Sequence, residues 1–149
     1  MRAVVQRVSR AAVCVEGRTV GEIGAGLLVL LSVGVDDTDD DARSMAAKVA
    51  QLRIFADEGG LMNRSVIDAG GSVLLVSQFT LHGDVRRGRR PSFITAAREP
   101  ASRRLYELTG TLIAAAGVSV SNGLFGAQMD VELVNAGPVT ILIDTKRAF

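Results

Sequence analysis

The chain has 149 residues, of which 48% are hydrophobic and 22% charged, so its size and composition fit one globular domain over residues 1–149. Its 17 lysines and arginines nearly balance 16 aspartates and glutamates, and the net charge of +1 does not by itself indicate a polyanionic partner. One histidine and one cysteine exclude a zinc site built from about four such ligands, and also an internal disulfide. A catalytic triad would have to use His82 or no histidine. Without a signal peptide or a membrane-spanning apolar run, we expect a cytoplasmic protein.

The first third of the chain is predicted to consist of strands. Arg2 to Val15 is rich in valine and alanine, with apolar residues at period two. A turn at Glu16–Arg18 leads into a second strand, Thr19 to Ile23. The apolar run Leu27 to Val33 does not alternate, which predicts a strand covered on both faces.

Five aspartates between positions 36 and 41 precede an apolar stripe at helical spacing. The stripe consists of Ala42, Met45, Ala46, Val49 and Leu52. Acidic residues at a helix start complement the helix dipole, and Thr38 or Asp39 can cap it. We interpret the aspartates as capping residues, because a calcium loop would need a spaced acidic pattern with a glycine and a distal glutamate.

The remaining elements follow from the same kinds of pattern. They are a short hairpin region (Ile54–Asp57 and Val66–Asp68), an apolar strand (Ser72–Phe79), a loop (His82–Pro91), a helix from near Pro100 to about Ala116 with Leu105, Leu108, Leu112 and Ala115 buried, and three closing strands (Val118–Leu124, Gln128–Val134 and Val139–Asp144). The predicted fold is α+β, mostly antiparallel or mixed β-sheet in a barrel- or roll-like arrangement with two principal helices.

A first candidate site is Ser77–Leu81, where an apolar strand meets a loop containing glycine. Ser77 and Thr80 are candidate nucleophiles, but each needs an activating base. His82 is the only imidazole nearby, and by itself it is better explained as a surface or hydrogen-bonding residue. A purely structural strand end remains an alternative.

Two further features have ordinary explanations when taken alone. Gly137–Pro138 between two strands is typical of a turn, because proline cannot donate to a β-ladder. Seven arginines fall within 19 positions: Arg86, Arg87, Arg89, Arg90, Arg98, Arg103 and Arg104. They are either a solvated surface or a local phosphate-binding patch, and both interpretations stay open.

Five segments occur together in the order and spacing of one family. They are MRAVVQRV at 1–8, SQFTL at 77–81, GRRPSF at 88–93, GLFGAQM at 123–129 and NAGPVT at 135–140. Through them the chain resembles the D-aminoacyl-tRNA deacylases, also called the D-tyrosyl-tRNA deacylase family, over essentially its full length. It departs from the family at Ala136, where an aspartate is frequent, which puts any role for an acid there in doubt.

The resemblance implies a homodimer that hydrolyses the ester between a D-amino acid and the terminal adenosine of tRNA, with no metal and no organic cofactor. It implies a cis Gly137–Pro138 bond that reaches into the partner's pocket, held by Arg7. The implied catalytic residues are Ser77, Gln78, Phe79 and Thr80; the implied substrate-binding residues also include Phe125, Ala127 and Met129; and the implied tRNA contacts are Arg86, Arg87, Arg89 and Arg90.

This reading predicts chiral proofreading by exclusion, in which the Gly137–Pro138 carbonyls reject an L-side chain. Glycine has no side chain to reject, so glycyl-tRNA is also a predicted substrate. We expect backbone amides near Phe79 and Thr80 to stabilise the oxyanion, and the ribose 2′-hydroxyl rather than Thr80 to assist attack. The alternatives are a non-catalytic module that binds the RNA acceptor end and an editing paralogue with another amino-acid specificity.

Overall fold

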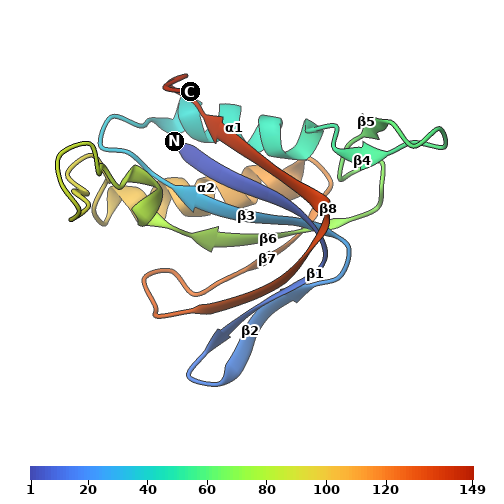
Figure 1. Ribbon diagram of the computed structural model, residues 1–149, viewed down its shortest axis with the longest axis horizontal. Coiled ribbons are helices and arrows are strands. Elements are labelled where there is room, and N and C mark those ends of the chain that lie inside the picture. The colour runs from blue at the N-terminus through green and yellow to red at the C-terminus, as the bar shows by residue number, and fades with distance from the viewer.

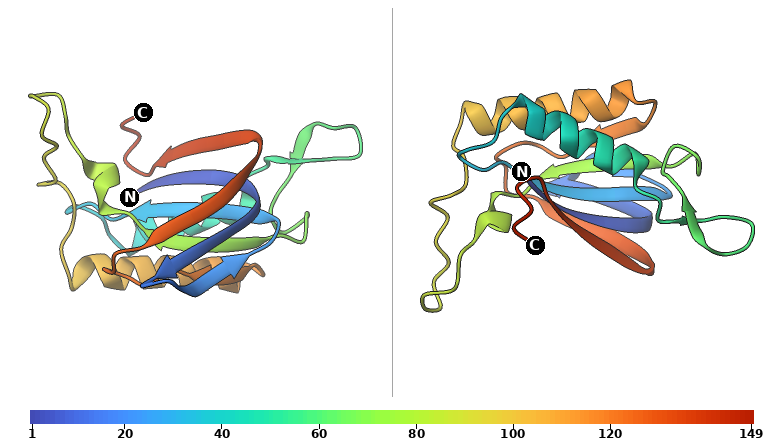
Figure 2. Two further views of the ribbon diagram at one scale, coloured as in Figure 1. Left: turned by 60° about the horizontal axis from the view of Figure 1, so that its bottom comes forward. Right: turned by 90° about the horizontal axis from the view of Figure 1, so that it is seen from above.

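The computed structural model describes residues 1–149 as a strongly curled mixed sheet with two helices on one face (Figures 1 and 2). The strands of the main sheet are β1 (Arg2–Val15), β2 (Arg18–Ile23), β3 (Gly26–Ser32), β6 (Ser72–Ser77), β7 (Ser119–Asn122) and β8 (Asp130–Asp144). Their order is β2-β1-β3-β6-β7, and β8 pairs with β1 outside this path. β6 is parallel to β3 and β7, whereas β1 is antiparallel to its neighbours.

The sheet curls until its two ends approach each other. Ser121 Oγ in β7 donates a 3.1 Å hydrogen bond to the Glu22 carbonyl in β2. The helices α1 (Asp39–Gln51) and α2 (Ala101–Ala115) lie against one another on the same side of the sheet. These features confirm the predicted α+β class, the mixed barrel-like sheet and the two principal helices. Neither helix is long and apolar enough to span a bilayer.

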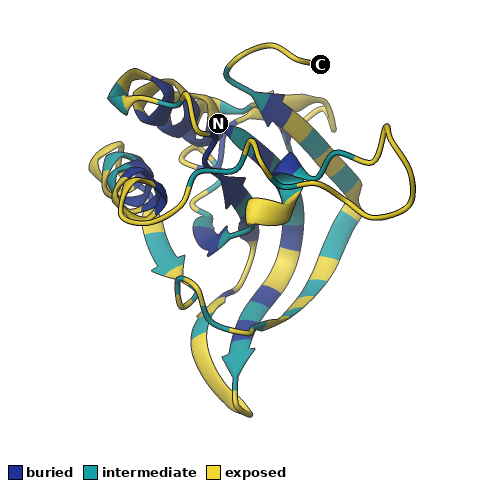
Figure 3. Cartoon of the chain, turned by 90° about the vertical axis from the view of Figure 1, so that its left-hand side faces the viewer, coloured by how far each residue is buried: buried dark blue, intermediate teal, exposed yellow.

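The strands β3 and β6 separate two apolar cores, because successive side chains point to opposite faces of a strand. In β3, Leu27, Val29 and Leu31 pack into the core under the helices, while Leu28 packs into a smaller core on the other face. This confirms that the run is covered on both faces. Figure 3 shows that both helices turn their buried residues inward and leave their outer surfaces exposed.

The start of α1 confirms the capping interpretation of its aspartates. Thr38 is the N-cap, and its backbone amide donates a 2.9 Å bond to Asp41 Oδ2. Asp41 also accepts from Lys146 Nζ at 2.8 Å and from Thr145 Oγ1 at 2.6 Å, so it ties the C-terminal residues to the helix.

The predicted stripe of the second helix is wrong in part. Pro100 is the N-cap of α2 rather than a first-turn residue, Ala115 is exposed, and Leu108 and Leu112 are only partly buried. The buried residues are Ser102, Leu105, Tyr106, Thr109, Gly110 and Ile113. The buried face is therefore rotated from the predicted one, and on it the Tyr106 hydroxyl donates to the Leu75 carbonyl at 2.8 Å.

The four strands predicted from residue 72 onward have different bounds in the structure. β6 ends at Ser77, two residues before the predicted end, and Phe79 instead begins a 3₁₀ turn, η1 (Phe79–His82). β7 is shorter than predicted, and β8 runs continuously through Gly137–Pro138 where we expected a turn. Proline is tolerated there because the other edge of β8 has no neighbour and the register with β1 is broken around it.

The predicted hairpin after α1 is present with a shifted second strand. It consists of β4 (Phe55–Ala56) and β5 (Met62–Arg64), instead of a second strand at Val66–Asp68. Val66 is fully buried in the core under the helices, so this part of the segment anchors the hairpin.

Candidate active site

A pocket of about 1,000 Å³ lies where the parallel strands β3 and β6 end. Because the carboxyl ends of parallel strands meet at one edge of a sheet, the chain leaves both strands there and opens a crevice. The walls come from residues 31–33, 76–79, 93–94, 96–99, 102, 125–129 and 131. Segments about fifty residues apart in the sequence therefore share one cavity.

Six of the residues proposed from the sequence line this pocket. They are Ser77, Gln78 and Phe79 at the end of β6, and Phe125, Ala127 and Met129 in the connection from β7 to β8. Most of the lining is apolar, and polar groups are concentrated at the end of β6 and near α2. Such a cavity, apolar with a few polar groups, suits a small organic ligand or the end of a larger one.

The pocket also contains residues that the sequence did not single out. Phe93 packs edge-on against Phe79 with ring centroids 5.1 Å apart, and Ile94 beside it is 85% exposed. Ser32 lies in the wall as well, and so does Arg98, which the sequence marked only as one of seven clustered arginines. Phe93 belongs to the GRRPSF segment, so the family resemblance could have identified it as a site residue. Nothing in the sequence marks Ser32, a serine at the end of an apolar strand.

Thr80 is exposed and outside the pocket wall, and it has no base beside it. Its Oγ1 accepts a hydrogen bond from Gln78 Nε2. His82 is buried, with its Nδ1 2.6 Å from Ser32 Oγ, so its ring is engaged elsewhere. Burial lowers the pKa of His82, which favours the neutral imidazole at pH 7. The hydrogen-bonding role expected for His82 is present, although the residue is not on the surface.

Gly137 and Pro138 are exposed at the register break of β8, and the peptide bond between them is cis. Arg7 fixes the neighbouring backbone: its Nε donates to the Ala136 carbonyl at 2.9 Å, and its Nη1 to the Ile54 carbonyl at 2.6 Å. This contact uses the backbone of residue 136, so it does not require an acidic side chain there.

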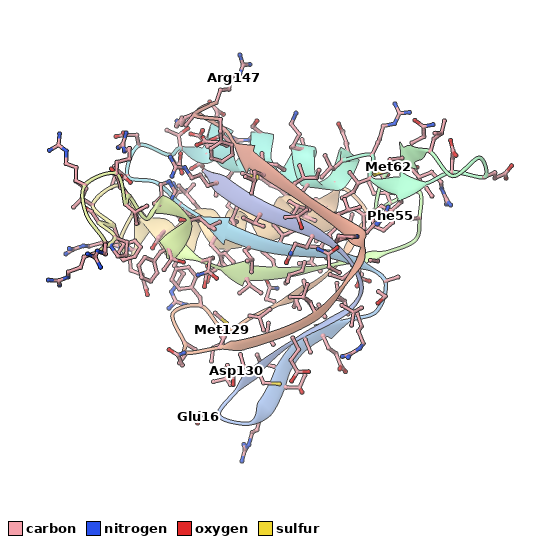
Figure 4. The ribbon with its side chains drawn as sticks, in the orientation of Figure 1. Glu16, Phe55, Met62, Met129, Asp130 and Arg147 are labelled. Carbon is pink, nitrogen blue, oxygen red and sulfur yellow. The ribbon has the colours of Figure 1, made fainter.

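Arg7, Gly137 and Pro138 do not line the pocket of their own chain. Arg7 is paired with Leu27 in β3, whereas the pocket begins at Leu31, about 13 Å further along the strand at 3.3 Å per residue. In Figure 4, Met129 at the pocket lies well apart from Phe55, the neighbour of the residue that Arg7 contacts. The pocket and the Gly137–Pro138 segment therefore lie at separate places in one chain.

The arginines near the pocket form two groups. Three of them are held in ion pairs: Arg86 with Asp84, Arg103 with Glu99, and Arg104 with Asp39. The Arg86 guanidinium donates to Asp84 and holds the pKa of that carboxyl well below its usual range. Arg87, Arg89, Arg90 and Arg98 are exposed and make no ion pair. No carboxylate neutralises these four arginines, the unpaired group, so their charge is available to bind an anion such as phosphate.

Known proteins share both the sequence and the fold. A family model described as D-Tyr-tRNA(Tyr) deacylase matches residues 4–144. Proteins called D-aminoacyl-tRNA deacylase are 59% identical in Koribacter versatilis, with both chains covered completely, and 54% identical in Thermus aquaticus, over 97% of this chain and 95% of the relative.

Two solved structures superimpose over nearly the whole chain. A c-Myc DNA unwinding element binding protein has a TM-score of 0.91 at 38% identity, covering 97% of this chain and 99% of its own. A probable eukaryotic D-amino acid tRNA deacylase has a TM-score of 0.81 at 20% identity, over 95% and 97% of the chains, which shows a shared fold. From the family match and the identity of these full-length relatives, the chain belongs to the D-Tyr-tRNA(Tyr) deacylase family.

Proposed function

We propose that this protein hydrolyses the ester of D-aminoacyl-tRNA and releases the free D-amino acid and tRNA. One observation carries the proposal: in a member of this family, segments 77–79 and 125–129 form one pocket of about 1,000 Å³. That volume suits an aminoacyl group together with part of the terminal nucleotide. The activity is a form of chiral proofreading in translation, and we assign it to the cytoplasm, where aminoacyl-tRNA is used.

Chirality is selected by Gly137–Pro138 of a second copy in a homodimer. The element is exposed, is braced by Arg7 and lies away from the pocket of its own chain, which supports a role at the pocket of a second chain. Its carbonyls face the α-carbon of the substrate and leave no room for an L-side chain. Selection by exclusion needs no side chain, which fits a site with few catalytic side chains.

The chemistry relies on orientation and on backbone donors. An aminoacyl ester is already activated, so positioning and stabilisation of the oxyanion supply much of the required rate enhancement. The amides of Phe79 and Thr80 are the proposed donors, since no side chain, turn or loop acceptor takes either of them. The ribose 2′-hydroxyl of the substrate assists the attacking water.

The activity is tested by incubating the protein with D-tyrosyl-tRNA and L-tyrosyl-tRNA in parallel and measuring released tyrosine. We expect the D-ester to be hydrolysed at least about a hundredfold faster, because a steric clash acts on the L-ester in the transition state. Equal rates would contradict chiral selection. Binding of tRNA without release from either ester would favour the non-catalytic binding module.

A third substrate in the same assay separates exclusion from recognition of a D-side chain. Glycyl-tRNA presents nothing for the carbonyls to reject, so we expect it to be hydrolysed as well. Complete resistance of glycyl-tRNA at high enzyme concentration would show that the site requires a D-side chain.

Thr80→Ala tests the choice between substrate assistance and a threonine nucleophile. We expect a loss of less than about tenfold in single-turnover rate, because the substitution removes one hydrogen-bonding hydroxyl and not an activated nucleophile. The outcome that contradicts us is a loss above a thousandfold with unchanged tRNA binding. A terminal 2′-deoxyadenosine is the complementary substrate, and it should be hydrolysed much more slowly by the unmodified protein.

A further inference from the structure

Ser32 in the wall of the pocket is hydrogen-bonded to His82, which does not line the pocket itself, and the mechanism above uses neither residue. Ser32 is the last residue of β3, and His82 is the last residue of the turn η1. Ser32 Oγ lies 2.6 Å from His82 Nδ1, and the two residues are 1% and 7% exposed. Through Ser32, the pair contacts the segment that carries the proposed oxyanion donors.

The geometry assigns a direction to these hydrogen bonds. Ser32 Oγ is also 3.3 Å from the Phe79 carbonyl oxygen, which can only accept. We therefore assign the serine proton to Phe79, so that Ser32 Oγ accepts from His82 in the tautomer that carries its proton on Nδ1. In this arrangement the histidine is a donor to serine and not its base, so the pair is not a nucleophile with its activator.

This chain of bonds orients one peptide group. The Phe79–Thr80 peptide is trans and planar, so its carbonyl and its N–H point in opposite directions. With the carbonyl held inward by Ser32, the Thr80 amide points outward from the core. A neighbouring peptide is fixed by a separate hydrogen bond, because the Gln78 amide donates to the Leu31 carbonyl at 2.8 Å.

We propose that Ser32 and His82 are positioning residues that hold the Phe79–Thr80 peptide with its amide presented to the ester carbonyl. The inference rests on the proposed function and assigns to it two residues outside the family motifs described above. The charged groups around the imidazole are Arg2, Asp37, Asp144 and the amino group of Met1. Burial nevertheless dominates, lowers the pKa of His82 and favours the neutral ring at pH 7.

Three variants distinguish positioning from simple filling of space. In His82→Asn the side-chain amide can take the place of Nδ1–H, whereas His82→Leu and Ser32→Ala break the chain of bonds. We expect His82→Leu and Ser32→Ala to slow single-turnover hydrolysis of D-tyrosyl-tRNA about tenfold with tRNA binding unchanged, and His82→Asn to stay near the wild-type rate. Melting temperatures identify any variant that fails to fold.

Equal loss in His82→Asn and His82→Leu, or a loss confined to tRNA binding, would overturn the proposal. A second measurement does not depend on activity: nitrogen NMR of the imidazole should show the proton on Nδ1, and Ser32→Ala should shift the Thr80 amide resonance. A proton on Nε2 would also overturn it. If the wild type releases no amino acid, the proposed function fails, while the NMR result still decides the bonding of this pair.

Discussion

Gly137→Ala is expected to reduce hydrolysis of D-aminoacyl-tRNA by more than about a hundredfold while the protein stays folded. Gly137 has a φ of +135°, and an added Cβ would lie 2.6 Å from Arg7 Nη2 and 3.0 Å from Val139 Cγ2. The methyl group must therefore displace the Arg7 guanidinium that braces this backbone, and the φ of Gly137 is one that other residues rarely adopt. A small misplacement at a reacting centre is costly. The measurement is the single-turnover rate together with the melting temperature.

Gly17→Ala is the matched control for this substitution. Gly17 also has a positive φ, +74°, in the turn between β1 and β2, but nothing lies within 4 Å of an added Cβ. It should cost about 1 kcal/mol in stability from backbone strain alone and leave the rate unchanged. Equal losses of rate in both variants would mean that strain, and not the position of Gly137–Pro138, explains the effect.

The same variant tests whether the element acts on the partner. Gly137→Ala retains an intact pocket, whereas Ala127→Trp fills its pocket and retains an intact Gly137–Pro138. A heterodimer of the two has one site built from the intact halves, so random mixing should restore about a quarter of the wild-type sites. If mixing two inactive variants restores nothing although heterodimers form, the cross-subunit arrangement is wrong.

Reversing the charge of Arg89 and Arg90 should weaken tRNA binding by at least about tenfold and lower the dependence of log Kd on log salt by about 1.5 to 2. Both side chains are exposed and free of ion pairs, so each can release a counterion from the RNA on binding. The measurement is a tRNA binding titration at several salt concentrations with Arg89→Glu/Arg90→Glu.

Arg10→Glu/Arg18→Glu makes the same change in net charge at exposed, unpaired positions on β1 and β2. This control should leave the salt dependence unchanged. If both double variants change it equally, the net charge of the protein and not the loop after η1 governs binding. Arg86→Glu is expected to have a smaller effect than Arg89→Glu, because Asp84 already neutralises Arg86.

The elements that the sequence predicted well are those whose pattern reflects a single local cause. The alternation of β1, the uninterrupted run in β3 and the capped start of α1 each follow from burial or from capping within one element. The buried face of α2 was predicted less well, since it is set by packing against distant parts of the chain, such as the strand whose Leu75 carbonyl accepts from Tyr106, 31 residues away.

The residues of the candidate site also differ in how well the sequence alone could predict them. Ser77–Phe79 and Phe125–Met129 were identified through family motifs, but only the fold brings them into one pocket. Ser32 was invisible in the sequence, because a serine that ends an apolar strand has no distinguishing pattern, and its role depends on a turn that follows 47 residues later. The continuity of β8 was missed because proline inside a strand is allowed only where one edge is free, which is a property of the whole sheet.

The free edge of β8 also bears on aggregation. This strand of 15 residues would otherwise offer a long row of unpaired amides and carbonyls, along which further chains could add as β-strands. Pro138 has no amide to donate, and the break in register around it bends the strand and divides the row into two short pieces. Pro138, proposed to help select substrate chirality, therefore also hinders the addition of further chains to the edge of the sheet. Replacing it would weaken chiral selection and would also favour aggregation along β8.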